Sequence, residues 1–357
     1  QSRSSAASDV YKRQIQGRGW NQVLWPDKKF PNSKILDELV PNKPIWLERI
    51  DGHAGWANTK ALELAGITTN TLSPPGGEIL RDSSGKPTGI LIDNAMDLVT
   101  KVIPPYDEKE LIQAIEIASN HLISLGITSV HDAGVSAREH RIYRALADKE
   151  ELLVRLYGMI SSTDSELSTI LSEGPVTDEN DLYSARSVKV YTDGALGSRG
   201  AALLQPYSDR PDHTGLLLTS KQTLRDILED AVLSGFQVAI HAIGDKGNQL
   251  ALDEIEWSYS SVGGKELRHR VEHAQVVDLE DIARFKLLNV IPSMQPTHAT
   301  SDMNMAEDRI GAERLKGAYA WRTFIDQGSR LASGSDFPIE LANPFSVSYT
   351  HLRAHET

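Results

Sequence analysis

Residues 221–245, KQTLRDILEDAVLSGFQVAIHAIGD, contain the pattern that decides the fold of this chain. The part KQTLRDILEDAVLSG (221–235) reads as a helix, and FQVAIHAIGD (236–245) reads as a short, apolar, buried strand. Helical and strand-like stretches alternate in this way along the chain from about residue 107. Strands that alternate with helices indicate an α/β fold, in which right-handed crossovers join the strands of a parallel sheet.

The same alternation extends in both directions from this stretch. EKELIQAIEIASNHLISLG (108–126) has Leu111, Ile115, Ala118 and Leu122 on one helical face and ends at a glycine that suits a helix terminus. Seven strand candidates occur in series, at residues 127–134, 152–161, 187–198, 236–245, 269–275, 289–298 and 330–338. Their nearly continuous apolar character indicates burial on both faces, as in a TIM-type (β/α)8 barrel. Such a barrel needs eight strands, so we expect an incomplete one.

The rest of the chain is less regular. Residues 15–106 are rich in Gly and Pro and contain a strand-like PIWLERIDGH and a short helix NTKALELAGI, which we interpret as a long insertion. The ends, residues 1–14 and 347–357, lack helical or strand periodicity and resemble translated sequencing adapters. Two native tails are the alternative. We therefore take 15–346 as the barrel fragment.

Composition excludes several classes of partner and site. The formal net charge is -12, so nothing favours binding to nucleic acid or to an anionic membrane. No apolar run is long enough to cross a bilayer. The chain contains no cysteine, which excludes disulfides and thiolate zinc sites but does not settle the compartment. A small-molecule substrate is the expected partner, and a homodimer is compatible with the sequence.

Four strand candidates carry or run into a residue capable of metal binding or acid–base chemistry: Lys189, His241, His273 and Asp336. The active sites of (β/α)8 barrels lie at the carboxyl ends of their strands. Histidine nitrogen and aspartate oxygen suit Zn²⁺, and carbamylation by CO₂ would convert a buried Lys189 into a carboxylate-like bridging ligand. Each residue alone has a simpler explanation, such as a core histidine, a salt-bridged lysine or a helix N-cap. The joint pattern favours a metal site.

These residues lie in motifs that resemble the amidohydrolase superfamily, and in particular amidohydrolase family 3, which includes N-substituted formamide deformylases. The matching segments span about residues 45–340 and are IDGHAGWANTKALELAGI, GITSVHDAG, VKVYTDGALGSRGAAL, VAIHAIGDKG, HRVEHAQ, SMQPTH and ASGSDFPIE. The resemblance implies a metal-dependent hydrolase of carbon–nitrogen bonds other than peptide bonds, in an amide, formamide or cyclic amide. Alternatives are a lactone or ester hydrolase and a non-catalytic ligand-binding barrel.

The resemblance also implies roles for individual residues. Lys189 would be the carbamylated bridging lysine of a site for one or two zinc ions, and His241 and His273 would bind the second ion. Asp336 would contact the first ion and act as general base. His53 and His298 would contact the substrate, although His53 fits a simple loop histidine equally well.

One departure from the family is large. Members carry a His-x-His pair on strand 1 and a small β-sandwich, and this sequence contains no His-x-His pair and stops just after the last strand. We therefore expect strand 1 and the β-sandwich to be missing and the fragment as given to be inactive or nearly so. His131 and Asp132 are expected at the end of a strand, where they would orient ligands or, as we favour, serve only as polar strand ends.

Overall fold

The computed structural model describes residues 14–353. The chain divides into two compact units. Unit 1 comprises the described residues up to Pro105, together with Asp193–Leu218 and Asn304–Arg309, and unit 2 comprises the remainder.

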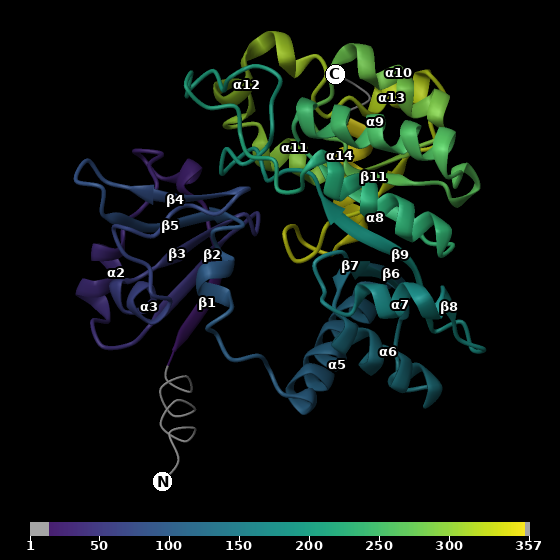
Figure 1. Cartoon of the computed structure of the whole chain (residues 1–357), viewed down its shortest axis with the longest axis horizontal. Helices are drawn as coiled ribbons and strands as arrows, with labels where there is room; N and C mark the ends of the chain where they lie inside the picture. The colour runs from purple at the N-terminus through teal and green to yellow at the C-terminus, as the bar shows by residue number, and fades with distance from the viewer. Residues whose placement is uncertain (1–13, 354–357) are drawn as a thin grey trace. The chain divides into compact units, whose positions relative to one another are not determined.

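Unit 2 is built on a sheet of strands that follow the order of the chain (Figure 1). Its parallel strands are β6 (Ser129–Val135), β7 (Arg155–Ser161), β9 (Tyr183–Tyr191), β10 (Gln237–Ala242), β11 (Arg270–His273), β12 (Ile291–Met294) and β13 (Ala332–Ser333). A short strand, β8 (Val176–Thr177), pairs antiparallel with β9. All seven predicted strands are present and parallel, which confirms the α/β class.

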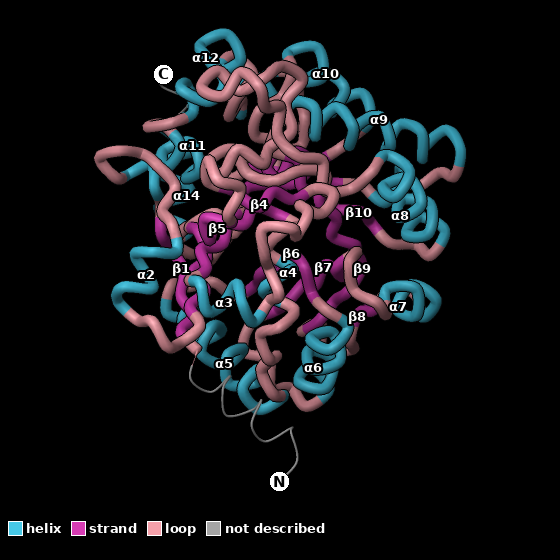
Figure 2. Tube along the Cα trace, turned by 60° about the vertical axis from the view of Figure 1, so that its left-hand side comes forward, coloured by secondary structure: helices cyan, strands magenta, loops and turns pink. Residues whose placement is uncertain are grey.

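Helices cover the outer side of this sheet, as Figure 2 shows for the cyan helices beside the magenta strands. Those between the strands or after them are α5 (Glu108–Ser124), α6 (Ala137–Asp148), α7 (Leu167–Glu173), α8 (Lys221–Leu233), α9 (Asp245–Ser261), the 3-10 helix η2 (Lys265–Leu267), α10 (Leu279–Leu288), α11 (Pro296–Asp302), α13 (Trp321–Asp326) and α14 (Pro344–Arg353). Helix α12 (Ala306–Leu315) begins in unit 1 and belongs to unit 2 only from Ile310. Phe236, Phe285 and Phe324 are fully buried within the core. Burial of such apolar surface is the main stabilising contribution.

Local sequence explains where the predicted helix of residues 108–126 begins and ends. Asp107 caps α5 in a capping box with Glu110, which satisfies amide groups of the first turn. Gly126 follows the helix with a φ of 78°, a conformation that glycine adopts without steric cost.

The parallel sheet is curled, in a half-barrel arrangement related to a (β/α)8 barrel. Within residues 14–353 no backbone pairing joins β13 to β6, so these two strands form the edges of the sheet. His131 and Asp132 were expected at a strand end, and this is wrong: both lie in the middle of β6, because the strand continues to Val135.

Unit 1 contains a five-stranded sheet in the order β1-β2-β3-β5-β4. The strands are β1 (Ile15–Trp20), β2 (Ile45–Arg49), β3 (Ala54–Ala57), β4 (Gly77–Arg81) and β5 (Pro87–Asp93); β1 and β2 are parallel, and the other pairs are antiparallel. The helical segments are η1 (Gln22–Leu24), α2 (Ser33–Leu39), α3 (Thr59–Leu64) and α4 (Asp97–Thr100). The stretch interpreted as an insertion thus forms a sheet of its own.

The two chain ends were excluded from the predicted barrel. Residues 1–13 lie outside the described part. Residues 347–353 continue helix α14, where the sequence showed no helical periodicity. None of the helices between residues 14 and 353 is both long and apolar enough to span a membrane.

Candidate functional site

The predicted site residues of unit 2 lie along neighbouring strand ends. Lys189 is near the end of β9, His241 is the penultimate residue of β10, and His273 ends β11. The Nζ atom of Lys189 lies 3.7 Å from the ring centroid of Tyr191, and the Tyr191 and His241 rings are 5.1 Å apart. The rings of His241 and His273 are 4.5 Å apart and edge-on. These side chains form one continuous series of contacts.

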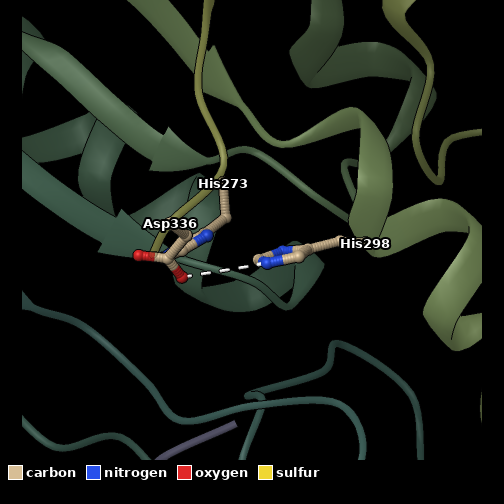
Figure 3. Close-up of side chains that lie close together, drawn as sticks. All are labelled: His273, His298 and Asp336. Atoms are coloured by element: carbon tan, nitrogen blue, oxygen red, sulfur yellow. Dashed lines mark ion pairs between the residues drawn. The ribbon is translucent and has the colours of Figure 1, made fainter. Parts of the chain in front are cut away.

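The series continues into a cluster that could hold a metal ion (Figure 3). The rings of His273 and His298 are stacked with centroids 5.8 Å apart, and His298 Nε2 lies 3.8 Å from Oδ2 of Asp336. One ligand atom from each of His273, His298 and Asp336 lies within 4.8 Å of the others. Two imidazole nitrogens and a carboxylate oxygen are a donor set that suits Zn²⁺.

The structure therefore brings together Lys189, His241, His273 and Asp336, and it places His298 among them. His298 was predicted to contact substrate, but its position suits a residue that binds the metal ion equally well. The sequence signal for His298 was its position in SMQPTH, just after a predicted strand. In the structure His298 lies two residues after Pro296, the first residue of α11. That signal located His298 at the carboxyl end of the sheet, whereas its distance to Asp336 depends on the tertiary fold.

The backbone of this site is strained at three non-glycine residues. His273, Ala274 and Asp336 have φ values of 77°, 41° and 58°. Left-handed conformations of this kind cost about 1–3 kcal/mol for residues with a Cβ and cluster at functional sites. Their occurrence at two of the predicted ligands supports a functional role for these strand ends.

Lys189 is buried, with 3% of its surface exposed. Its ammonium group lies over the ring of Tyr191, an aromatic face that attracts a cation. Neither Tyr191 nor Gln295, whose side chain contacts His273, was singled out from the sequence. To predict either residue, one would have to know which strand ends are neighbours in the folded chain.

His131 and Asp132 have structural partners instead of metal-binding ones. Arg270 donates from Nη1 to Nδ1 of His131 over 2.8 Å and pairs through Nε with Glu272 over 2.7 Å. Burial, and then the charge of Arg270, lowers the pKa of His131. Asp132 accepts a hydrogen bond of 2.8 Å from the Tyr143 hydroxyl, and burial raises the pKa of Asp132.

His53 belongs to unit 1, where its Nδ1 lies 2.7 Å from Oδ1 of Asp93. Burial raises the pKa of Asp93, while the contact with His53 opposes that rise. The imidazole is thus oriented by a buried carboxyl group, as in other polar sites with a directed histidine. Contact between His53 and a substrate stays a prediction.

The chain resembles known proteins along most of its length. The sequence profile described as the amidohydrolase family matches residues 5–356. The chain is 36% identical over 352 residues to the protein LONG AFTER FAR-RED 3 of Arabidopsis thaliana, covering 95% of this chain and 60% of that protein. It is 30% identical over 346 residues to the N-substituted formamide deformylase of Arthrobacter pascens, covering 93% and 62%. The chain thus spans less than two thirds of the length of these relatives.

A solved structure supports the same relationship. The crystal structure of an uncharacterized metal-dependent hydrolase from Pyrococcus furiosus superposes with a TM-score of 0.70 and 31% sequence identity. The superposition covers 97% of this chain and 70% of that one. The structural superposition therefore supports the same relationship as the sequence similarity.

Proposed function

The chain belongs to the amidohydrolase family, and from this premise we propose that the protein is a metal-dependent hydrolase. Its substrates would be compounds with a carbon–nitrogen bond other than a peptide bond, such as amides, formamides or cyclic amides. The observation that carries the proposal is the cluster of His273, His298 and Asp336 next to His241 and Lys189. The similarity to the formamide deformylase of Arthrobacter pascens supports the choice of bond.

The donor groups fit a zinc ion in two overlapping ways. In the first, His241, His273 and a carbamate on Lys189 would hold the ion, and Asp336 would face it. In the second, His273, His298 and Asp336 would hold it. His273 is common to both sets, and each set provides three protein ligands, the number usual in catalytic zinc sites. When bound, such an ion polarises a substrate carbonyl and lowers the pKa of water towards neutrality.

The side chains would then divide the remaining work. The carboxylate of Asp336 would accept the proton of the attacking water and pass it to the departing nitrogen, so that a C–O bond forms as the C–N bond breaks. His298, 3.8 Å from this carboxylate, would orient it or the substrate carbonyl. Carbamylation of Lys189 joins its neutral amine to CO₂ with loss of one proton. The carbamate would remove the cost of a buried ammonium.

The proposal is tested by measuring zinc content and turnover together. The chain, and a version extended at its N-terminus with a His-x-His strand, are purified and loaded with zinc. Release of amine is followed on a panel of N-formyl and N-acyl amines, and release of acid is followed on lactones and esters of similar size. We expect zinc-dependent turnover of the amides by the extended version and little or none by the chain alone. Turnover of the esters alone would support the alternative bond, and absence of both zinc and turnover in the extended version would contradict the proposal.

Single alanine variants distinguish the two ligand sets. We expect His273→Ala to abolish zinc binding, because this residue belongs to both sets. If His241→Ala weakens zinc binding more than His298→Ala, the set with the Lys189 carbamate is correct, and the opposite order favours the set with Asp336. His213→Ala, in unit 1, is the control and should bind zinc like the parent. Zinc binding that survives His273→Ala would exclude both sets.

A further inference from the structure

Gln295 connects the end of β12 to His273, the last residue of β11. It lies directly after Met294 at the start of α11 and is buried, with 8% of its surface exposed. Its Oε1 lies 2.7 Å from Nδ1 of His273, and its Nε2 donates to the backbone carbonyl of Ser293 over 3.1 Å. Both ends of the amide are therefore engaged by buried partners.

The carbonyl of Ser293 determines which way the amide points. A backbone carbonyl can only accept a hydrogen bond, so the atom of Gln295 that faces it must be the NH₂ group. Turning the amide over would place two acceptor oxygens against each other in a buried setting, where an unmade hydrogen bond costs about 1–3 kcal/mol. The oxygen of Gln295 must consequently face His273.

The orientation of the amide determines the tautomer of His273 in turn. An amide oxygen can only accept, so Nδ1 of His273 must carry the proton that it donates. In a neutral imidazole the other nitrogen, Nε2, then carries the lone pair that a metal ion requires. A neutral histidine in water has the opposite preference and carries its proton mainly on Nε2.

We propose that Gln295 is a positioning residue that keeps His273 in the Nδ1–H tautomer and thereby presents Nε2 as the ligand atom. The tautomer follows from the contacts of Gln295 alone, and only the identity of the ion at Nε2 rests on the proposed function. Residues that donate or accept at the second nitrogen of a metal-binding histidine typically change metal affinity about 10–100-fold when they are replaced.

The test begins with the metal-free chain, labelled with ¹⁵N and held near pH 8, where an unperturbed histidine is neutral. Two-bond ¹H–¹⁵N correlation spectra report which ring nitrogen carries the proton, and a His273→Gln variant identifies the signals of His273. We expect the Nδ1–H form in the parent. In Gln295→Met, which has similar length and no acceptor oxygen, we expect His273 to shift towards Nε2–H, and zinc to bind about 10–100-fold more weakly.

Two further variants separate this role from a general effect of burial. Gln295→Glu keeps an acceptor oxygen and should retain the Nδ1–H tautomer. Gln275→Met removes another buried amide, which contacts Asp302 and Tyr319, and should leave the His273 tautomer unchanged. If Gln295→Met does not fold, the smaller variant Gln295→Ala takes its place, and the same shift of His273 towards Nε2–H is expected there.

The outcomes separate this inference from the proposed function. An Nε2–H form of His273 in the parent, or an unchanged tautomer in folded Gln295→Met, would overturn the role of Gln295. The expected tautomer shift in a chain that binds no zinc in any form would support that role and would overturn the proposed metal site.

Discussion

At the scale of single residues, the site is marked by backbone conformation as much as by side-chain chemistry. His273 and Ala274 end β11 in the left-handed region, with φ values of 77° and 41°. The turn that they make carries the chain away from the strand directly after His273. A residue with a Cβ is strained there, and glycine is not.

Replacing Ala274 by glycine tests this strain. We expect Ala274→Gly to leave the free energy of unfolding unchanged or to raise it, because relief of about 1–3 kcal/mol of strain matches or exceeds the greater entropy of glycine in the unfolded chain. Ala242 is the matched control, since it is equally buried but lies in strand β10. Ala242→Gly should cost about 0.5–1 kcal/mol. Urea unfolding measures both, and equal losses would contradict the strain at Ala274.

At the scale of elements, a buried histidine links the starts of two neighbouring strands. His269 precedes β11, and its Nδ1 accepts a hydrogen bond of 3.0 Å from the backbone N–H of Val238 in β10. Burial lowers the pKa of His269 to about 4. The folded chain therefore keeps this imidazole neutral at pH values where the unfolded chain has already bound a proton.

The pH dependence of stability follows from that difference. The contribution of neutral His269 to the stability of the folded chain is fully present above the pKa of this residue in the unfolded chain, about 6.5. It is lost as the pH falls towards about 4, the folded value, and then levels off. The total is about 3 kcal/mol at 1.36 kcal/mol per pKa unit. Urea unfolding at pH 7 and at pH 4 measures this loss of stability. In His269→Gln the free energy of unfolding should fall by correspondingly less between the two pH values. A fall as large as that of the parent would show that other groups cause the pH dependence.

At the scale of the whole molecule, segments far apart in the sequence build unit 1. A Cβ on Gly194 or Gly200 would lie 2.2 or 2.0 Å from a carboxylate oxygen of Asp93, and a Cβ on Gly197 would lie 2.6 Å from Nη1 of Arg49. The glycines of DGALGSRG thus let the loop approach two buried polar side chains of the five-stranded sheet. Their spacing reflects packing within unit 1.

Gly200→Ala should therefore destabilise unit 1 by about 1–3 kcal/mol, the usual cost of overpacking. The clash is with the buried Asp93 carboxylate, which the contact with His53 prevents from moving freely. Gly334→Ala is the control, because a Cβ there meets no heavy atom within 4 Å. Thermal unfolding compares the two variants. A Gly200→Ala chain as stable as the control would show that the loop does not pack against Asp93 in this way.

The order of the parallel strands could be predicted from sequence because its causes are local. Each strand is a short apolar run, each helix repeats its apolar residues on one face, and termini such as Asp107 and Gly126 have their own local signals. The same rules placed Lys189, His241 and His273 near the carboxyl ends of neighbouring strands. A parallel sheet requires those ends to meet at one edge.

The tertiary structure alone decided which side chains contact one another at that edge. Gln295 and His273 are 22 residues apart in the chain, and no periodicity connects them. The predicted strand 187–198 stops at Tyr191 because its glycines pack within unit 1, a long-range effect. Local sequence thus determined the elements and their order, because propensity and periodicity act over a few residues. Pairings across the fold depend on which elements become neighbours, so the distance from His298 to Asp336 and the tautomer of His273 follow from the folded chain.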